Sequence, residues 1–236
     1  MQSAAGKNNK LARMILTMAI VAGAIFVAGC TNQTQVTYIV WVDGLDNCTC
    51  DGTAEILVPM PLRNDRPIFT SDKIYFIKPG TGREVRDSAW TATALDTKYG
   101  RMISIRSKND TLSNFGMRAD ASFDKPHSED SYNQAFNSIM NNPLSPTYNK
   151  TDYVYASGSN NPLTYDMTYP PNFTTLIYIG ENIKPTPGEI GNLTIYAYLL
   201  VSGGTGGCVD PEMSVRIYRE VAPEERGMNN AEVRFY

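Results

Sequence analysis

Hydrophobic and polar side chains alternate along much of the chain after residue 34, and this pattern predicts β-strands. In the segment 115–123, Phe, Met and Ala alternate with Gly, Arg, Asp and Ser. That period is typical of a strand with one face in a core and the other in water. The segment 35–43 is apolar on both of its faces, so we expect this strand to be buried within a sandwich.

Other short apolar runs bounded by turn residues predict the remaining strands. They cover 54–58, 73–78, 89–96, 101–107, 152–156, 174–180, 192–201, 213–220 and 233–236. We expect 35–43 to form a hairpin with 54–58 through the loop 44–52, and 89–96 to form a second hairpin with 101–107. Pro59 and Pro61 should close the strand at 54–58, because proline cannot donate to a ladder.

A single helix is predicted in the segment 128–140. Ser128 can cap it, and the following residues form an apolar stripe at helical spacing. The many strands and the single helix predict an all-β fold class. We expect an antiparallel β-sandwich or jelly roll with one short helix, preceded by an N-terminal hydrophobic signal or anchor. The expected organisation is a leader at 1–29, a short tether at 30–34 and one β-sandwich domain at 35–236. The Asn- and Pro-rich stretch 141–172 could instead divide two small sandwiches, but no short linker separates two complete strand sets.

The first thirty residues have the composition of a secretory signal. Three basic residues precede an apolar run from Met14 to Gly29, which ends in Val27-Ala28-Gly29-Cys30. This ending resembles the lipobox of prokaryotic lipoprotein precursors. The resemblance implies cleavage before Cys30, lipid attachment to its thiol, and an exported protein that stays fastened to the outside of the cell membrane. An uncut membrane anchor and a pilin-like leader, which would make the protein a filament subunit, are the alternatives.

Charge and sequons refine the expected location and partners. The leader carries three basic and no acidic residues, so its removal lowers the net charge from −3 to −6. Without a Lys/Arg cluster, such a chain is not expected to bind nucleic acid. The expected partners are the membrane, through the N-terminal lipid or helix, and a surface protein or glycan. Six Asn-X-Ser/Thr sequons, about twice the chance number, suggest glycosylation of an archaeal surface protein, with a bacterial envelope as the alternative. They begin at Asn32, Asn47, Asn109, Asn149, Asn172 and Asn192.

If Cys30 carries the lipid, the cysteines that remain for other roles are Cys48, Cys50 and Cys208. We expect a disulfide from Cys208 to Cys48 or Cys50, and none between Cys48 and Cys50, on the argument that alternate residues of an extended segment face opposite ways. If the loops 44–52 and 202–210 share one end of the sandwich, the bridge closes a loop of about 160 residues and stabilises by roughly 4–5 kcal/mol. Three thiolates holding a metal with Asp51 or water are the alternative.

Candidate catalytic and ligand-binding residues are sparse. The single histidine, His127, flanks the predicted helix as a solvated residue would, and nothing resembles a Gly-x-Ser-x-Gly elbow. Gly203–Gly207 lacks the residues of a phosphate-binding loop and is better explained as a hairpin connection. The carboxylates and amide of the loop at 43–51 (Asp43, Asp46, Asn47, Asp51) do not follow the spacing of a calcium loop. We therefore expect no metal and no cofactor.

Tyrosines are the remaining candidates for a binding surface, because their rings combine contact area with a polar tip. Those singled out are Tyr148, Tyr153, Tyr155, Tyr165, Tyr169 and Tyr178. The segment Leu95–Ile105 loosely resembles stretches of uncharacterised archaeal surface proteins, which implies no activity. The expected function is thus that of a membrane-tethered surface or envelope protein with a binding or structural role. An extracellular hydrolase on a jelly-roll scaffold and a filament subunit are the alternatives.

Overall fold

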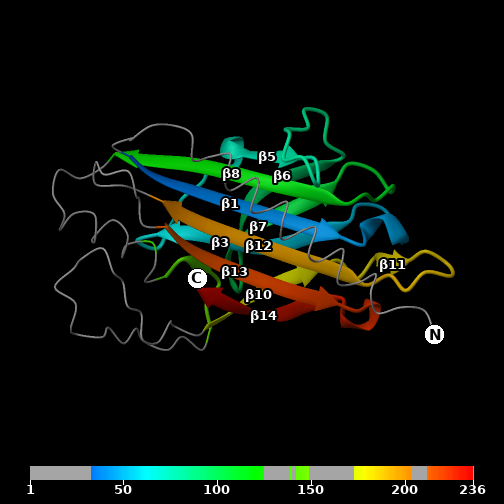
Figure 1. Cartoon of the computed structure of the whole chain (residues 1–236). Coiled ribbons are helices and arrows are strands. Elements are labelled where there is room, and N and C mark those ends of the chain that lie inside the picture. The colour runs from blue at the N-terminus through cyan, green and yellow to red at the C-terminus, as the bar shows by residue number, and fades with distance from the viewer. Residues whose placement is uncertain (1–32, 125–138, 140–141, 149–172, 203–211, 236) are drawn as a thin grey trace, which may run out of the picture.

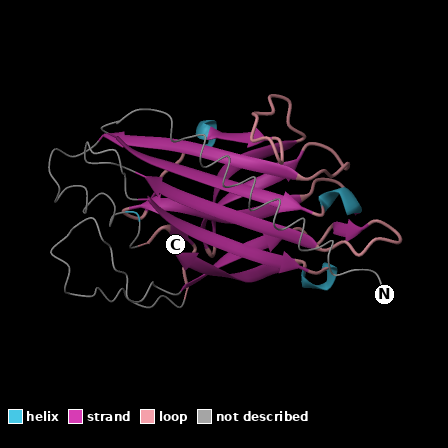
Figure 2. Ribbon diagram, in the orientation of Figure 1, coloured by secondary structure: helices cyan, strands magenta, loops and turns pink. Residues whose placement is uncertain are grey.

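The computed structural model describes residues 33–124, 139, 142–148, 173–202 and 212–235, and these form an almost entirely antiparallel β-structure (Figures 1 and 2). The long strands are β1 (Gln33–Asp43), β3 (Glu55–Arg63), β6 (Trp90–Thr97), β7 (Gly100–Ser107), β8 (Phe115–Asp124), β10 (Phe173–Ile179), β12 (Leu193–Ser202), β13 (Glu212–Val221) and β14 (Gly227–Phe235). The short elements are β2 (Cys48–Cys50), β4 (Arg66–Pro67), β5 (Ile74–Ile77), β9 (Leu144–Ser145), β11 (Ile183–Pro185) and the 3-10 turns η2 (Leu45–Asn47), η3 (Ser71–Lys73) and η4 (Pro223–Glu225).

One twelve-stranded sheet folds over to make both layers of the sandwich. Its strand order is β5-β8-β1-β12-β13-β14-β10-β3-β7-β6, with β4 and β9 attached to β3. β14 joins the layers, because its last residues pair with β13 while the rest of the strand pairs with β10. The two outer strands, β5 and β6, approach each other, and the Ala94 N–H of β6 donates to Ser71 Oγ in η3 at 3.1 Å. The result is a nearly closed, barrel-like sandwich.

The two ends of this sandwich carry different connections. At the end where β1 begins, which we call the Gln33 end, lie the ends of β3, β8 and β12, with Ser202 opposite both Gln35 and Glu212. At the other end, which we call the cysteine end, β1 finishes at Asp43 opposite Thr194. There the short β2 pairs with β11, and backbone hydrogen bonds, such as that from the Thr186 N–H to the Asn47 carbonyl at 3.0 Å, link the turns.

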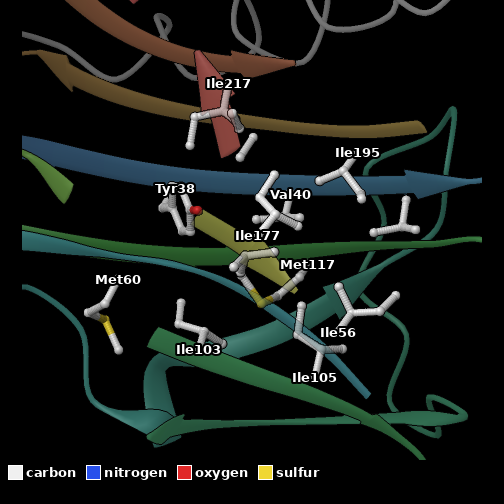
Figure 3. Packing of buried hydrophobic residues seen from close by; sticks show 14 of the residues in the cluster. Tyr38, Val40, Ile56, Met60, Ile103, Ile105, Met117, Ile177, Ile195 and Ile217 are labelled. Atoms are coloured by element: carbon white, nitrogen blue, oxygen red, sulfur yellow. The ribbon is translucent and has the colours of Figure 1, made fainter. Parts of the chain in front are cut away.

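Aliphatic side chains from both layers fill the space between them (Figure 3). The central strands contribute alternate residues, such as Val36, Tyr38 and Val40 of β1 and Ile103 and Ile105 of β7, all fully buried. The alternation predicted for 115–123 is confirmed, since Phe115, Met117 and Ala119 face this core. β1 is apolar on both faces: its inner face packs in the core, while Ile39 and Trp41 on its outer face are buried by side chains of neighbouring strands and not by a second layer.

Two sequence predictions about β1 and β3 are wrong. β1 forms no hairpin with β3; it pairs with β8 and β12, and the loop after it crosses the cysteine end to the opposite layer. Pro59 and Pro61 do not close β3, which continues to Arg63. The backbone nitrogens of both prolines point away from β7 and β9, toward the edge of β3 on which β10 pairs only with Ile56 and Leu57. The missing N–H groups therefore interrupt no pairing with β7 or β9.

The hairpin predicted for 89–96 and 101–107 is confirmed as β6 and β7, which pair from Trp90–Ser107 to Thr97–Gly100. The short pair β2 and β11 was not predicted, because its residues lie in a turn-rich stretch. The strand expected at 152–156 falls outside the described residues. So does the helix expected at 128–140, apart from Ile139, which is buried in the core.

Candidate binding face

The outer surface of β5, β8, β1, β12 and β13 carries two aligned rows of side chains, which we call the aromatic face. Strand register places residues of neighbouring strands directly opposite one another. The first row is Ile77, Gly116, Trp41, Tyr196 and Tyr218. The second row is Tyr75, Arg118, Ile39, Tyr198 and Arg216. Figure 1 shows β8, β1, β12 and β13 side by side in this layer.

Trp41 fits into the first row because its neighbour on β8 is a glycine. A Cβ on Gly116 would lie 2.6 Å from Trp41 Cε3 and still closer to Cζ3, so the indole ring rests directly on the Gly116 backbone. Ile77, Tyr75 and Tyr196 pack around the ring and leave it only 8% exposed. Its indole N–H is buried and has no hydrogen-bond partner within the described part of the chain. The centre of the face is therefore apolar apart from the Trp41 indole N–H, for which the described residues supply no acceptor.

A polar network borders this apolar centre. The Asp120 carboxylate accepts hydrogen bonds from Thr37 Oγ1 at 2.7 Å, from Tyr75 OH at 2.5 Å and from Arg118 Nε at 2.8 Å. Burial alone would raise the pKa of Asp120, but the bonds from Arg118, Tyr75 and Thr37 outweigh it and hold that pKa below its ordinary value. Burial, followed by the bond to Asp120, raises the pKa of the Tyr75 hydroxyl. The network is therefore a fixed ion pair near neutral pH.

The far side of the face combines rings and a guanidinium. Arg216 Cζ lies 5.4 Å from the centre of the Tyr198 ring, a cation–π distance. Tyr218 on the same strand is 48% exposed, the most accessible ring of the face. Five strands spaced about 4.8 Å apart make the face roughly 19 Å wide. Such a surface offers flat apolar area, ring faces and guanidinium donors, which is chemistry for binding.

Of the six tyrosines singled out from the sequence, the two that are described do not belong to this face. Tyr148 and Tyr178 are described, and Tyr178 lies on the outer surface of β10 in the opposite layer, against Leu57 and Met228. Tyr148 donates from its OH to the Tyr99 carbonyl at 3.3 Å. The other four lie outside the described residues. The tyrosines of the face were missed, although the alternation in the segment 193–202 already places Tyr196 and Tyr198 on its polar side.

At the cysteine end, Arg226 ties three segments together. Its guanidinium donates to the carbonyls of Gly191 at 2.6 Å, Val221 at 3.2 Å and Ile183 at 3.2 Å. Cys48 Sγ lies 4.0 Å from the same group. Burial raises the pKa of the Cys48 thiol against the opposing effect of Arg226. Both Cys48 and Cys50 are buried free thiols, so this end is held by hydrogen bonds.

The argument made for Cys48 and Cys50 from the sequence needs a correction. Cys48 and Cys50 face the same way, because side chains two residues apart in a strand share a face, and β2 is buried, exposed, buried. The two cysteine-bearing loops also start at opposite ends of the sandwich. Asp43 lies at the cysteine end, whereas Ser202 and Glu212 lie opposite each other at the Gln33 end. Cys208 itself lies outside the described residues, so the bridge expected from it stays a prediction.

The acidic residues of the loop at 43–51 do not converge. Asp46 accepts hydrogen bonds from the backbone N–H and the Nδ2 of Asn114, while Asp51 lies 3.6 Å from Lys184 Nζ. Within the described ranges, no group of three or more His, Cys, Asp or Glu side chains is placed to hold a metal ion.

The sequons that can be placed are accessible. Asn47, Asn109 and Asn192 are exposed, and all three lie in turns at the cysteine end. Cys30, Asn32, His127, Asn149, Asn172 and Gly203–Gly207 fall outside the described residues. In the part of the chain that the structure covers, no helix has the length and apolar composition needed to cross a bilayer. No family model, curated protein or solved structure matches the chain.

Proposed function

We propose that this chain is an exported protein, tethered to the outside of the cell membrane through a lipid on Cys30, that binds a protein partner through its aromatic face. The observation that carries the proposal is the alignment of Trp41, Tyr75, Tyr196, Tyr198 and Tyr218 with two arginines on one continuous sheet surface. The proposed role is adhesive or structural, without a chemical step.

The composition of the face favours a protein as the partner. Tyr, Trp and Arg are the residues enriched at protein–protein interfaces and among their energetic hot spots. Strands of ten residues, about 33 Å long, make the outer surface of four such strands roughly 600 Å², close to the ~800 Å² that each partner buries in a standard interface. The Trp41 ring is only 8% exposed beneath Tyr75 and Tyr196, so it presents no open ring face on which a sugar could stack.

The two ends of the sandwich support the proposed orientation. β1 begins three residues after Cys30, so the Gln33 end would face the membrane. The exposed sequons at Asn47, Asn109 and Asn192 lie at the opposite end, where glycans would not collide with the bilayer. We extend the proposal to glycosylation at these three sites. In this orientation the aromatic face is roughly perpendicular to the membrane, where it is accessible to a neighbouring envelope protein.

Photocrosslinking in intact cells tests the binding face. A photoreactive phenylalanine analogue replaces Tyr218, and a matched control carries it at Tyr99, which is 37% exposed in the turn between β6 and β7. We expect a discrete adduct from position 218 only, and its loss when Tyr198→Ala or Arg216→Ala is added. Equal adducts from both positions, or none from position 218, would refute the binding face. Mass spectrometry of the purified N-terminus tests the tether, since an unmodified Met1 start would contradict it.

A further inference from the structure

A pocket at the Gln33 end carries two arginines beside an aromatic ring. Its volume is about 480 Å³, within the range of small-ligand sites. It is lined by Arg63, Asn64, Arg66, Pro67, Ile68 and Phe123. Arg63, Asn64 and Arg66 come from the tight hairpin between β3 and β4, and Phe123 comes from the end of β8 in the other layer. The pocket therefore opens where the two layers of the sandwich meet.

The hairpin turn fixes the position of both arginines. Asn64 and Asp65 have φ angles of 50° and 59°, the left-handed conformation that a two-residue turn of this kind requires at both positions. Arg63 and Arg66 are consequently paired directly across the hairpin. The Arg63 guanidinium lies 4.3 Å from the centre of the Phe123 ring, which forms one wall of the pocket.

The charge of the pocket favours an anion. The nearest carboxylate of the turn, Asp65, accepts a hydrogen bond from Asn142 Nδ2 at 2.8 Å and is not part of the lining. Among the described residues, Arg66 makes no ion pair, and its side chain is exposed at the rim. The exposed Arg66 guanidinium can bind two phosphate oxygens in a forked geometry, with the Asn64 amide as a further donor. The Arg63 guanidinium, stacked on Phe123, adds a second positive charge to the lining.

Strand register places this pocket next to the proposed lipid attachment. Phe123 lies directly opposite Thr34 on β1, and Thr34 follows Cys30 by four residues, a chain length of at most about 14 Å. We infer that Arg66 and Asn64, beside the positive charge of Arg63, bind the headgroup phosphate of a membrane phospholipid, so that the domain docks on the bilayer by its Gln33 end. This inference rests on the proposed tether.

Chemical modification of the mature chain tests the site. The purified protein is treated with phenylglyoxal, an arginine reagent, once in phosphatidylglycerol vesicles and once in maltoside micelles, which hold no phosphate. We expect Arg66 to react about fivefold more slowly in the vesicles. The exposed Arg83 and Arg86, near the cysteine end, should react equally in both and serve as internal controls. Addition of inorganic phosphate to the micelles should give no protection. If it protects as well as the vesicles do, the site takes a soluble anion and the inference is overturned.

Lipid retention gives an independent measurement. In native mass spectrometry of protein extracted from membranes, the wild type and an Arg83→Gln/Arg86→Gln control should retain one phospholipid more than Arg63→Gln/Arg66→Gln. Equal retention by all three overturns the pocket even when Cys30 carries its lipid. An unmodified Cys30 with arginine-dependent retention would instead refute the tether and leave the pocket standing. The double control changes the charge equally, so a general electrostatic effect would affect both doubles alike.

Discussion

The hydroxyl group of Tyr38 provides a sharp test of how the core is held together. Tyr38 is fully buried, and its side chain projects from β1 among the aliphatic residues of both layers (Figure 3). Its hydroxyl has no hydrogen-bond partner among the described residues. Burial strongly raises the pKa of this phenol, so it stays neutral at all pH values relevant to folding. The Tyr38→Phe substitution should therefore stabilise the protein.

The magnitude follows from two opposing terms. A buried donor without a partner costs about 1–3 kcal/mol relative to its hydrated state. Removal of one oxygen leaves a void of roughly 10 Å³, which costs only about 0.2 kcal/mol. Tyr38→Phe should thus raise the free energy of unfolding by about 1–2 kcal/mol, or the melting temperature by roughly 2–4 °C per kcal/mol for a domain of this size.

Guanidinium unfolding followed by fluorescence measures the effect, and the slope with denaturant should not change. Tyr75→Phe is the matched control, because its hydroxyl donates to Asp120 at 2.5 Å. That substitution should lower the free energy of unfolding by about 1 kcal/mol. If Tyr38→Phe is destabilising by about 1 kcal/mol or more, the hydroxyl must bind a buried water molecule, and the reasoning is refuted.

Four further expectations concern the aromatic face and the cysteine end. The pKa of Asp120 is lower in the folded than in the unfolded protein, so the stability that this carboxylate contributes is present above its unfolded pKa near 4 and is lost as pH falls through the lower folded pKa. The free energy of unfolding, measured as a function of acid pH, should show this loss in the wild type but not in Asp120→Asn. Gly116→Ala should destabilise by about 1–3 kcal/mol and alter tryptophan emission, since the new methyl group would displace Trp41; an unchanged spectrum and stability would contradict the packing described. Arg226→Gln should lower the free energy of unfolding by about 2–3 kcal/mol, because three carbonyls lose a charged donor, whereas the exposed Arg86→Gln should have almost no effect. Burial raises the pKa of the Cys48 and Cys50 thiols, so both should react slowly with a disulfide reagent until denaturant is added; fast reaction of the native protein would argue against their burial.

Strand positions were predictable because they depend on local alternation. Phe115–Asp124 shows its buried and exposed faces in the sequence itself, and the structure places them as expected. The pairing of strands was less accessible. β3 is the next long strand after β1 in the sequence and has a compatible apolar pattern. The segment between them nevertheless carries the chain to the other layer, so the two strands do not pair. Turn residues alone do not distinguish a hairpin from such a crossing.

The candidate sites depend on register, which a single sequence does not reveal. Tyr196 and Tyr198 stand on the polar side of β12, a signal present in the sequence. Their alignment with Trp41 and Ile39 becomes visible only once β1 and β12 are paired. The pairing of Arg63 with Arg66 follows from a two-residue turn, Asn64-Asp65, in which neither residue is glycine. No glycine therefore marked that hairpin in the sequence.

The central position of β1 determines how the domain responds to mechanical load. If the chain is tethered through Cys30 as proposed, a pull on the tether acts along β1, which is bonded to β8 from Gln33 to Val42 and to β12 from Gln35 to Asp43. Force in this direction shears both ladders at once, so their hydrogen bonds must break together instead of unzipping one by one. A protein held by this strand would resist drag on the cell surface while its other strands remain folded.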